Sequence, residues 1–527
     1  DCQFVAVSRM SNAASVPAPS GGWNAKDSYD TMPAGDAVKM VNLIPRDGFV
    51  ESRKGYSLFC NLGVTSPGVY GESIFSSQSG LFVGYGGQIV DITTGTPATI
   101  FSSGQLAVTQ WQTTRFQDKL IACCAEVSNP LYQPGQVIDS TNVATELVVT
   151  GPTGAFWGCN TFKGRVYYWQ EDSCSFWYAQ AGAFQGVLTE FDLSTQITTG
   201  ATLVMMLTYT LDAGDGVDDL AVFIFSTGET LVYQGDDPEN SLRWSSSGRF
   251  QIGEPLGIRA HQKVGGTEII LTKDGYVDLA QALRNGRYSE ESSYSNKIIG
   301  AAKEAARSYG DLFGWECLLY PAGNLFIVNV PQSAQTLTPD GEGNYFYSTN
   351  SIQHVRNTST GAWCKFEGIN ANAFCVYNDQ LYFLNSTDVF LADVGNSDNG
   401  NQISFECIPA FNHLGAKGRR KQVTLCSHIT NFAYPEYIVK DGMSDYKVEY
   451  QNQVVTSNFS PGTFWDLVDW DEAFWSSEEE TLIQTTEGWS DVSAFGYAVT
   501  VSLRISLNGF AFKWYATNYI YRPAGVI

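Results

Sequence analysis

The sequence is poor in positive charge. Its 527 residues include 31 Lys and Arg against 54 Asp and Glu, which gives a formal net charge of −23 at pH 7. Sequence-specific nucleic-acid binding needs a cationic surface, because phosphate contacts and counterion release supply most of the affinity. The composition therefore disfavours such a binder. Two explanations of the acidic surplus stay open, namely solubility alone or an acidic wall past which DNA slides without sticking.

Patterned cysteines are also missing. The 11 cysteines form an odd set with no CxxC pair, although Cys123 and Cys124 are adjacent. A secreted disulfide framework shows an even, regularly spaced set, so we expect buried, reduced thiols, which suit assembly in a cytoplasm. The first ten residues, DCQFVAVSRM, lack the basic and apolar regions of a signal peptide. No stretch approaches the ~18 apolar residues of a membrane span.

The motifs of common catalytic sites are absent too. The sequence contains no GxSxG elbow, P-loop, HExxH or kinase signature, and no convincing copy of the S-x-D-x-G-x-T-W turn of sialidases. Its four histidines are isolated from one another, so we expect structural or surface roles for them: His261, His354, His413 and His428. We therefore expect no enzyme activity, no cofactor and no metal.

The sequence is rich in short apolar segments that flank two-residue turns. Such alternation around Asn, Asp and Gly pairs is the strongest short-range signal for a β-hairpin. Low charge combined with many Gly, Thr, Ser and aromatic residues also indicates short strands and tight turns. The predicted units are 81–93, 113–124, 156–180, 219–235, 267–283, 315–331 followed by 352–368, and 373–393.

The spacing of these hairpins predicts an all-β fold. A four-stranded propeller blade takes about 40–50 residues, and the turn centres lie roughly 30 to 65 residues apart. We therefore predict a β-propeller of six to eight blades over residues 67–400, with an array of β-sandwiches as the alternative. One helix is predicted, from Ser295, which would cap it, to Phe313, between blades five and six.

From about Ile403 the pattern changes to longer alternating segments, which could pair as strands of a terminal β-sandwich. We therefore predict a C-terminal β platform at 401–527, with an acidic, Trp-rich insertion at 441–491. Residues 1–20 end in SVPAPSGG, a composition typical of an arm or a linker.

The segment from Gly21 to Phe59, GGWNAKDSYDTMPAGDAVKMVNLIPRDGFVESRKGYSLF, resembles the N-terminal signature of tail-hub proteins of short-tailed bacteriophages. These are also called nozzle or packaged-DNA stabilisation proteins. Weaker similarity extends through the hairpins to the closing NGFAFKWYATNYIYRP strand. We assign residues 21–66 as the part that joins platform and propeller. The insertion at 441–491 departs from what a minimal member would have.

The resemblance implies a structural virion protein. Members of the family look like six-fold rings below the portal and adaptor, built on a β-propeller with a platform of terminal strands. They extend the DNA channel, help to retain the genome and conduct it at ejection. The partners implied are other copies of the chain, the adaptor and portal ring, tail fibre or distal tail proteins, and double-stranded DNA in non-specific passage.

Three groups of residues are candidates for function. The aspartates Asp212, Asp215, Asp218 and Asp219 do not have the spacing of an EF-hand. They form either a solvated turn or, in a ring, an acidic loop facing the lumen. The second group, Lys417, Arg419, Arg420 and Lys421, forms either a solvated turn or a docking point for an acidic neighbouring ring or for DNA phosphate.

The third group consists of Trp465, Trp470, Trp475 and Trp489 in the acidic insertion. Tryptophans beside acids form either a sugar platform or the buried anchors of a subunit interface, and we prefer the interface. The competing hypothesis for the whole chain is a glycan-binding or glycan-degrading propeller, such as a receptor-binding adhesin or a depolymerase.

Overall fold

The computed structural model describes residues 11–63, 71–103, 110–124, 135–212, 217–285, 289–333, 336–339, 345–348, 350–432, 434, 437–452 and 486–524, with the side chains of 210–218 and 334–349 left aside. The chain divides into two compact units. The sandwich unit comprises 1–57, 354–368 and 393–527, and the propeller unit comprises 58–353 and 369–392. The units interleave along the chain, so their limits differ from the expected continuous domains 1–20, 21–66, 67–400 and 401–527.

Seven groups of paired strands follow one another along the described part of the propeller unit, and the sixth group is the first two strands of an eight-stranded sheet. The unit also contains two two-stranded sheets, β15 (Val149–Thr150) with β19 (Gly186–Val187) and β30 (Thr336–Pro339) with β31 (Tyr345–Ser348). The strands of the seven groups are β7 (Gly71–Ser76), β8 (Leu81–Tyr85), β9 (Gln88–Asp91) and β10 (Ala98–Ser102); β11 (Gln112–Phe116), β12 (Lys119–Cys123), β13 (Gln136–Ile138) and β14 (Ala144–Glu146); β16 (Gly158–Phe162), β17 (Arg165–Trp169), β18 (Ser175–Tyr178) and β20 (Thr189–Asp192); β21 (Leu203–Asp212), β22 (Val217–Phe225), β23 (Glu229–Gly235) and β24 (Trp244–Gln251); β25 (His261–Val264), β26 (Thr267–Thr272) and β27 (Gly275–Asp278); β28 (Glu316–Tyr320) and β29 (Leu325–Pro331); and β34 (Ala373–Tyr377), β35 (Gln380–Asn385), β36 (Asp388–Ala392) and β6 (Tyr56–Asn61).

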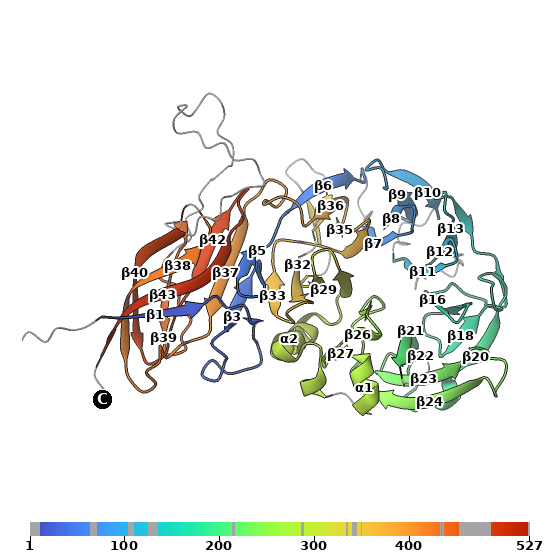
Figure 1. Cartoon of the computed structure of the whole chain (residues 1–527). Coiled ribbons are helices and arrows are strands. Elements are labelled where there is room, and N and C mark those ends of the chain that lie inside the picture. Colours follow the sequence, from blue (N-terminus) through green and yellow to red (C-terminus); the bar gives the residue numbers. More distant parts are fainter. Residues whose placement is uncertain are drawn as a thin grey trace, which may run out of the picture. The chain divides into compact units, whose positions relative to one another are not determined.

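The seven groups form a closed ring of blades, so the predicted β-propeller is confirmed and the array of sandwiches is not (Figure 1). Neighbouring blades share apolar cores. Phe75 of the first packs with Leu120 of the second, and Tyr167 of the third with Phe223 of the fourth. The first and last blades share a core that includes Val83. The outer strand of the last blade, β6, comes from the start of the chain, and thus two distant segments close one blade.

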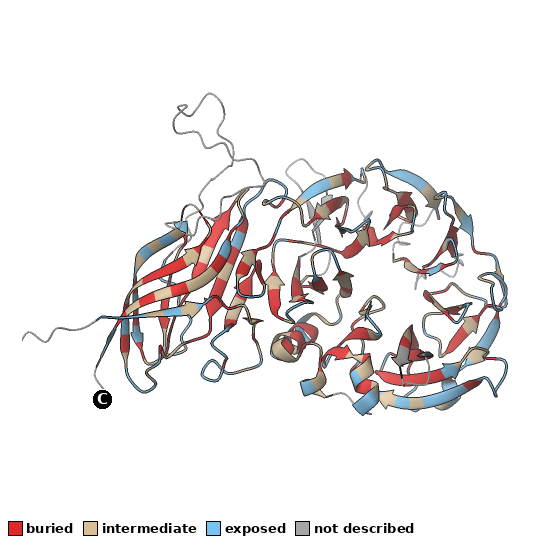
Figure 2. Ribbon diagram, viewed as in Figure 1, coloured by how far each residue is buried: buried red, intermediate tan, exposed pale blue. Residues whose placement is uncertain are grey.

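Three of the predicted hairpin turns have the backbone of a type I′ turn. Gly86–Gly87, Lys163–Gly164 and Asn378–Asp379 all have positive φ at both residues, as a type I′ turn requires. The burial of a strand depends on its position in the blade. Outer strands such as β24 are largely exposed, whereas the inner strands are buried (Figure 2). Local turn chemistry and alternation therefore account for the repeating part of the fold.

The predicted helix is present but shorter. It begins at Ile299 and ends at Tyr309 (α2), and lies between β27 and β28 as expected; a short helix, α1 (Leu279–Asn285), precedes it. Ser295 does not cap it through its side chain. Its Oγ instead accepts a hydrogen bond from the backbone N–H of Tyr276, at 3.0 Å, so the hydroxyl serves the neighbouring strand β27.

The sandwich unit combines strands from both ends of the chain. One sheet has the order β4 (Leu43–Pro45), β5 (Val50–Ser52), β43 (Lys513–Pro523), β38 (Lys421–Thr430) and β40 (Thr486–Gly496), with β1 (Asn12–Pro17) also paired to β43. The other strands are β33 (Trp363–Phe366), β2 (Gly22–Trp23), β3 (Asp36–Val41), β37 (Ile403–Pro409) and β42 (Leu503–Leu507), and the pair β39 (Gly442–Ser444) and β41 (Val499–Val501). Strand β32 (Ser351–Asn357) crosses the boundary between the units.

Two predictions about this unit have different outcomes. The long C-terminal segments pair as expected, β37 with β42 and β38 with β43. The N-terminal arm is wrong for residues 12–17, because they form β1 and pair with β43 along their whole length. The apolar core beneath this sheet includes Val423, Cys426 and Tyr519 packed with Val499 and Val501.

Candidate functional site

Arg53, in the segment that carries the resemblance, forms a buried ion pair in the sandwich unit. Its guanidinium donates to both carboxylate oxygens of Asp398, at 2.8 and 2.6 Å, and the two side chains are 2% and 9% exposed. Its Nε donates to Asn42 Oδ1 at 2.8 Å, and its remaining hydrogens reach the carbonyls of Lys54 and Glu367. Every oxygen in this set is neutralised or hydrogen-bonded, which is the condition for burying charge.

Other residues of the same segment also serve the fold. The Asn24 side chain donates to Asp36 at 2.8 Å and to Asp27 at 2.9 Å, which closes the turn before β3. Gly22 has φ +81°, and a Cβ there would lie 2.5 Å from the carbonyl oxygen of Trp363. The signature is therefore a set of contacts that build the sandwich unit, without the groups of a reaction centre.

The basic run lies at the turn that leads into β38. Lys417 and Arg419 are exposed and Arg420 is half-buried. The guanidinium of Arg420 lies over two aromatic rings. It is 5.6 Å from the ring centroid of Phe495, in β40, and 5.2 Å from that of Tyr497, which follows the strand. We call Lys417, Arg419, Arg420, Phe495 and Tyr497 the basic-aromatic patch.

Lys421 is not part of this patch, so its prediction as a docking residue is wrong. It is fully buried, and its Nζ donates to the carbonyls of Ala416, Arg419 and Tyr497 at 2.8, 3.0 and 2.7 Å. Burial lowers the pKa of this amine. All three ammonium hydrogens of Lys421 therefore hold the turn in place. In this turn the side chains of Lys417 and Arg419 are exposed to solvent.

Two acidic groups lie beside the patch, Asp30 and the exposed Asp445, whose Oδ1 accepts from the backbone N–H of Tyr497 at 2.7 Å. The Asp30 carboxylate accepts from Tyr446 Oη at 2.6 Å and lies 3.9 Å from His413 Nε2. The Tyr446 hydroxyl, together with the charges of Lys417 and His413, lowers the pKa of Asp30. Because two carboxylates lie beside the three cations Lys417, Arg419 and Arg420, the patch keeps a small positive surplus.

The aspartate cluster lies largely outside the described residues. Asp215 belongs to the part not described, and the side chains of Asp212 and Asp218 are also left aside. Asp219 is half-buried on β22, where it pairs with Thr210 of β21. The assignment of this loop to a lumen therefore stays a prediction.

Three of the four interface tryptophans, Trp465, Trp470 and Trp475, also lie outside the described residues. Trp489 is described, and it lies on β40 with 45% of its surface exposed. It is opposite Ser427 of β38. On the same exposed alternation of β40 are Asp491 and Phe495, so this strand presents aromatic and acidic side chains to solvent.

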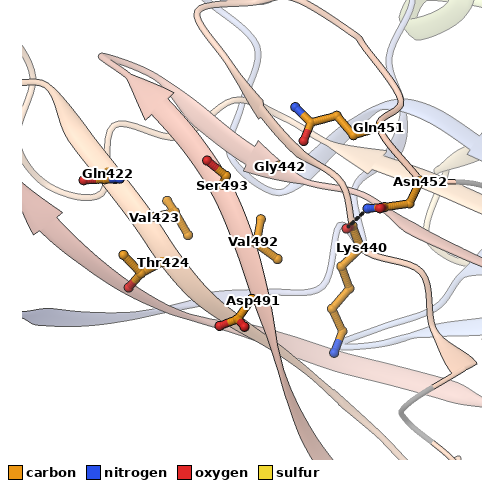
Figure 3. A pocket seen from close by; sticks show the side chains of 10 residues that line it. All are labelled: Gln422, Val423, Thr424, Lys440, Gly442, Gln451, Asn452, Asp491, Val492 and Ser493. Carbon is orange, nitrogen blue, oxygen red and sulfur yellow. Dashed lines mark hydrogen bonds between the residues drawn. The ribbon is translucent and has the colours of Figure 1, made fainter.

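A polar hollow of about 380 Å³ lies in the sandwich unit, over the bulge where β38 and β40 shift register (Figure 3). Lys440 Nζ donates to Gly488 O at 2.6 Å and to Ser490 Oγ at 2.9 Å, and burial lowers its pKa. Asn452 hydrogen-bonds the Lys440 carbonyl. The lining residues are Gln422, Val423, Thr424, Lys440, Gly442, Gln451, Asn452, Asp491, Val492 and Ser493. This lining suits a small polar ligand and contains no nucleophile paired with a base.

Charged groups also gather on the inner strands of the propeller unit. Arg259 donates to the carbonyls of Glu72 and Asn372, at 2.7 and 3.4 Å. Burial raises the pKa of Glu316, against the opposing charge of Arg259 and the N–H of Phe374, which donates to this carboxylate at 2.9 Å. These contacts bind the first, sixth and last blades together, and the hairpin pattern of the sequence does not predict them.

A smaller hollow of about 80 Å³ lies among the inner strands of the second to fifth blades. His261 Nδ1 lies 3.7 Å from Glu268 Oε2, and neither atom has a hydrogen-bond partner within the described residues. A polar hollow of this size is large enough to hold ordered water. The lining residues are Gln112, Thr113, Trp157, Cys159, Asn160, Trp169, Met206, Ile258 and His261.

Two of the four histidines are structural. His354 and His428 are buried, and burial lowers the pKa of each to about 3. His428 is held between Thr517 Oγ1 and the carbonyl of Ser502, at 2.9 and 3.1 Å. In the described residues, no three His, Cys, Asp or Glu side chains are grouped so that they could hold a metal ion.

Neither a protein-family model nor a curated protein matches the chain. Solved structures similar to it include virginiamycin B lyase from Staphylococcus aureus, 10% identical, over 63% of this chain and 96% of that one, with a TM-score of 0.34. The β-propeller domain of Cps50 (Swd1) from Myceliophteria thermophila is also 10% identical, over 63% and 98%, with a TM-score of 0.35. None of the helices in the described part of the chain has the length and apolar character needed to span a bilayer.

Proposed function

We propose that this chain is a structural, non-enzymatic protein of a short-tailed phage tail, assembled in the host cytoplasm. Copies of it form a nozzle ring, with six copies as the expected number, below the portal and adaptor. The ring extends the DNA channel, helps to retain the packaged genome and conducts it at ejection. Its remaining partners are tail fibre or distal tail proteins.

The observation that carries this proposal is the position of the signature segment. Residues 21–57 contribute β2 to β5 and the Arg53–Asp398 pair to a sandwich unit that the C-terminal strands complete. A propeller together with a platform of terminal strands is what the resemblance implies. Support therefore comes from a match in architecture and from signature residues that have identifiable structural roles.

The charge of the chain agrees with the proposed passage of DNA. Six copies would carry six times the net charge of −23, or 138 negative charges. B-DNA presents about one negative charge per 1.7 Å of its axis. An acidic ring repels phosphate and keeps the duplex from adhering. Closed rings require head-to-tail contacts between two different surfaces of each copy.

Electron microscopy of the purified chain with symmetry analysis tests the proposal. The expected result is a six-fold ring with an axial channel wide enough for a DNA duplex. A monomer or trimer with a closed pocket that binds oligosaccharides on a glycan array would overturn it and favour the adhesin or depolymerase alternative.

A further inference from the structure

The basic-aromatic patch is an exposed concentration of positive charge on a strongly acidic chain. Lys417, Arg419 and Arg420 lie within four residues of one another, whereas acids outnumber bases by 23 overall. The buried ammonium of Lys421 fixes the turn that presents them. Phe495 adds an aromatic ring that is 49% exposed. A partner for this surface should combine carboxylates with aromatic side chains.

The chain itself contains a segment of that composition. Residues 453–485 include no Lys or Arg and three tryptophans, Trp465, Trp470 and Trp475. The acids of this segment are Asp466, Asp469, Asp471, Glu472, Glu478, Glu479 and Glu480. Carboxylates pair with guanidinium and ammonium groups, and indole rings bind cations and stack on other aromatics. The two surfaces are therefore complementary in charge and in side-chain type.

One end of this segment is attached far from the patch. Thr486 begins β40, and the patch lies at the opposite end, where Gly496 pairs with Lys421. Ten steps of about 3.3 Å separate the two ends of this strand by about 33 Å. The other attachment, Asn452, hydrogen-bonds the Lys440 carbonyl and lines the same hollow as Val492 and Ser493, nearer the middle of β40 (Figure 3).

We propose that the basic-aromatic patch of one copy binds the acidic segment 453–485 of a neighbouring copy. A patch and a segment that differ in composition and are complementary in charge are what a head-to-tail contact between identical chains requires. DNA phosphate is the weaker candidate, because three cations must act against the acidic surface of the rest of the chain. This inference rests on the proposed ring and names the contact that would close it.

Two charge-reversed variants of the full chain test this contact. The patch variant carries Lys417→Glu, Arg419→Glu and Arg420→Glu. The segment variant replaces six acids by Lys, at Asp469, Asp471, Glu472, Glu478, Glu479 and Glu480. A matched control, Lys54→Glu, Lys163→Glu and Lys263→Glu, changes the net charge by the same amount as the patch variant at three separate exposed sites.

Sedimentation velocity gives the degree of association. We expect each variant alone to associate at least tenfold more weakly than the parent chain, and the control to associate like the parent. An equimolar mixture of the two variants should restore assembly, because each acidic segment then meets a basic patch and each basic segment meets an acidic one. A pairing within one chain predicts no such restoration.

A labelled peptide of residues 453–485 provides a second measurement. It should bind the full parent chain in a salt-dependent manner and bind the patch variant at least tenfold more weakly. Circular dichroism of every variant establishes that it is folded. Equal peptide binding to both chains, or mixed variants that stay apart, overturns the inference.

The outcomes separate this inference from the ring proposal. A six-fold ring that both variants leave intact overturns the contact alone. Assemblies of another number that the variants abolish retain the contact and overturn the six-fold ring.

Discussion

The propeller and sandwich units treat buried polar groups differently. In the propeller, the core between the third and fourth blades is aromatic, and the Tyr167 hydroxyl and Trp244 Nε1 are buried there without partners in the described residues. In the sandwich, Arg53 and Asp398 are buried with a full set of partners. The first core depends on apolar volume, whereas the second depends on particular residues in particular places.

This difference determines how many different sequences each core accepts. A core of packed aromatics accepts many apolar sequences of similar volume. A buried ion pair accepts few, because removal of one partner leaves an unpaired charge. Residues 21–55, which carry β2 to β5 and Arg53, build the sandwich unit around such a pair.

The largest expected effect on stability comes from breaking the Arg53–Asp398 ion pair of the sandwich unit. Arg53→Ala leaves Asp398 buried without its cation, and we expect a loss of about 3–5 kcal/mol in the free energy of unfolding. Urea unfolding measures it. The control is Arg46→Ala, which removes a partly exposed pair with Glu51 and should cost at most about 1 kcal/mol. Equal losses in the two variants would remove the distinction between these pairs.

Acid should weaken the sandwich unit through His354 and His428. Their folded-state pKa values, about 3, lie below the unfolded value of 6.5. The unfolded chain therefore takes up protons first, and stability falls as the pH drops from 6.5 towards 3. At pH 5 we expect a loss of about 2 kcal/mol per histidine, from 1.36 kcal/mol per pH unit. Unfolding of His428→Gln across this range should show a shallower pH dependence, and an unchanged slope would contradict the assignment.

In the propeller unit, removal of a buried polar atom that has no partner should raise the free energy of unfolding. Tyr167→Phe deletes a hydroxyl that is buried without a partner, so we expect a gain of about 1 kcal/mol, measured by the same urea unfolding. Tyr168→Phe is the matched control, because the Tyr168 hydroxyl donates to the carbonyl of Phe184 and its removal should cost stability. A loss from Tyr167→Phe equal to that of the control would show that the two hydroxyls are not different.

The smallest effect concerns a blade turn. Asp379 has φ +60° in a type I′ turn, which Gly adopts without strain. We expect Asp379→Gly to raise the melting temperature slightly, by the equivalent of a few tenths of a kcal/mol. A drop of several degrees would show that this turn depends on contacts of the carboxylate.

The blades could be predicted because their information is local. Alternation and turn residues such as Lys163–Gly164 mark each hairpin, and no distant partner is needed to recognise them. The strands β1, β3 and β5 are harder to predict, because their partners β37 and β43 lie about 365 to 510 residues away and no local period identifies them. The burial of Lys421 follows from the alternation of β38, which turns Lys421 and Val423 inward and Gln422 outward.

The native mass of the purified full chain at low salt tests the central claim most directly. Six copies of 57.8 kDa give a particle of about 347 kDa, and we predict this mass as the main species. A species of 57.8 kDa at every concentration, with no larger assembly, would contradict the account of this chain as a ring-forming nozzle protein.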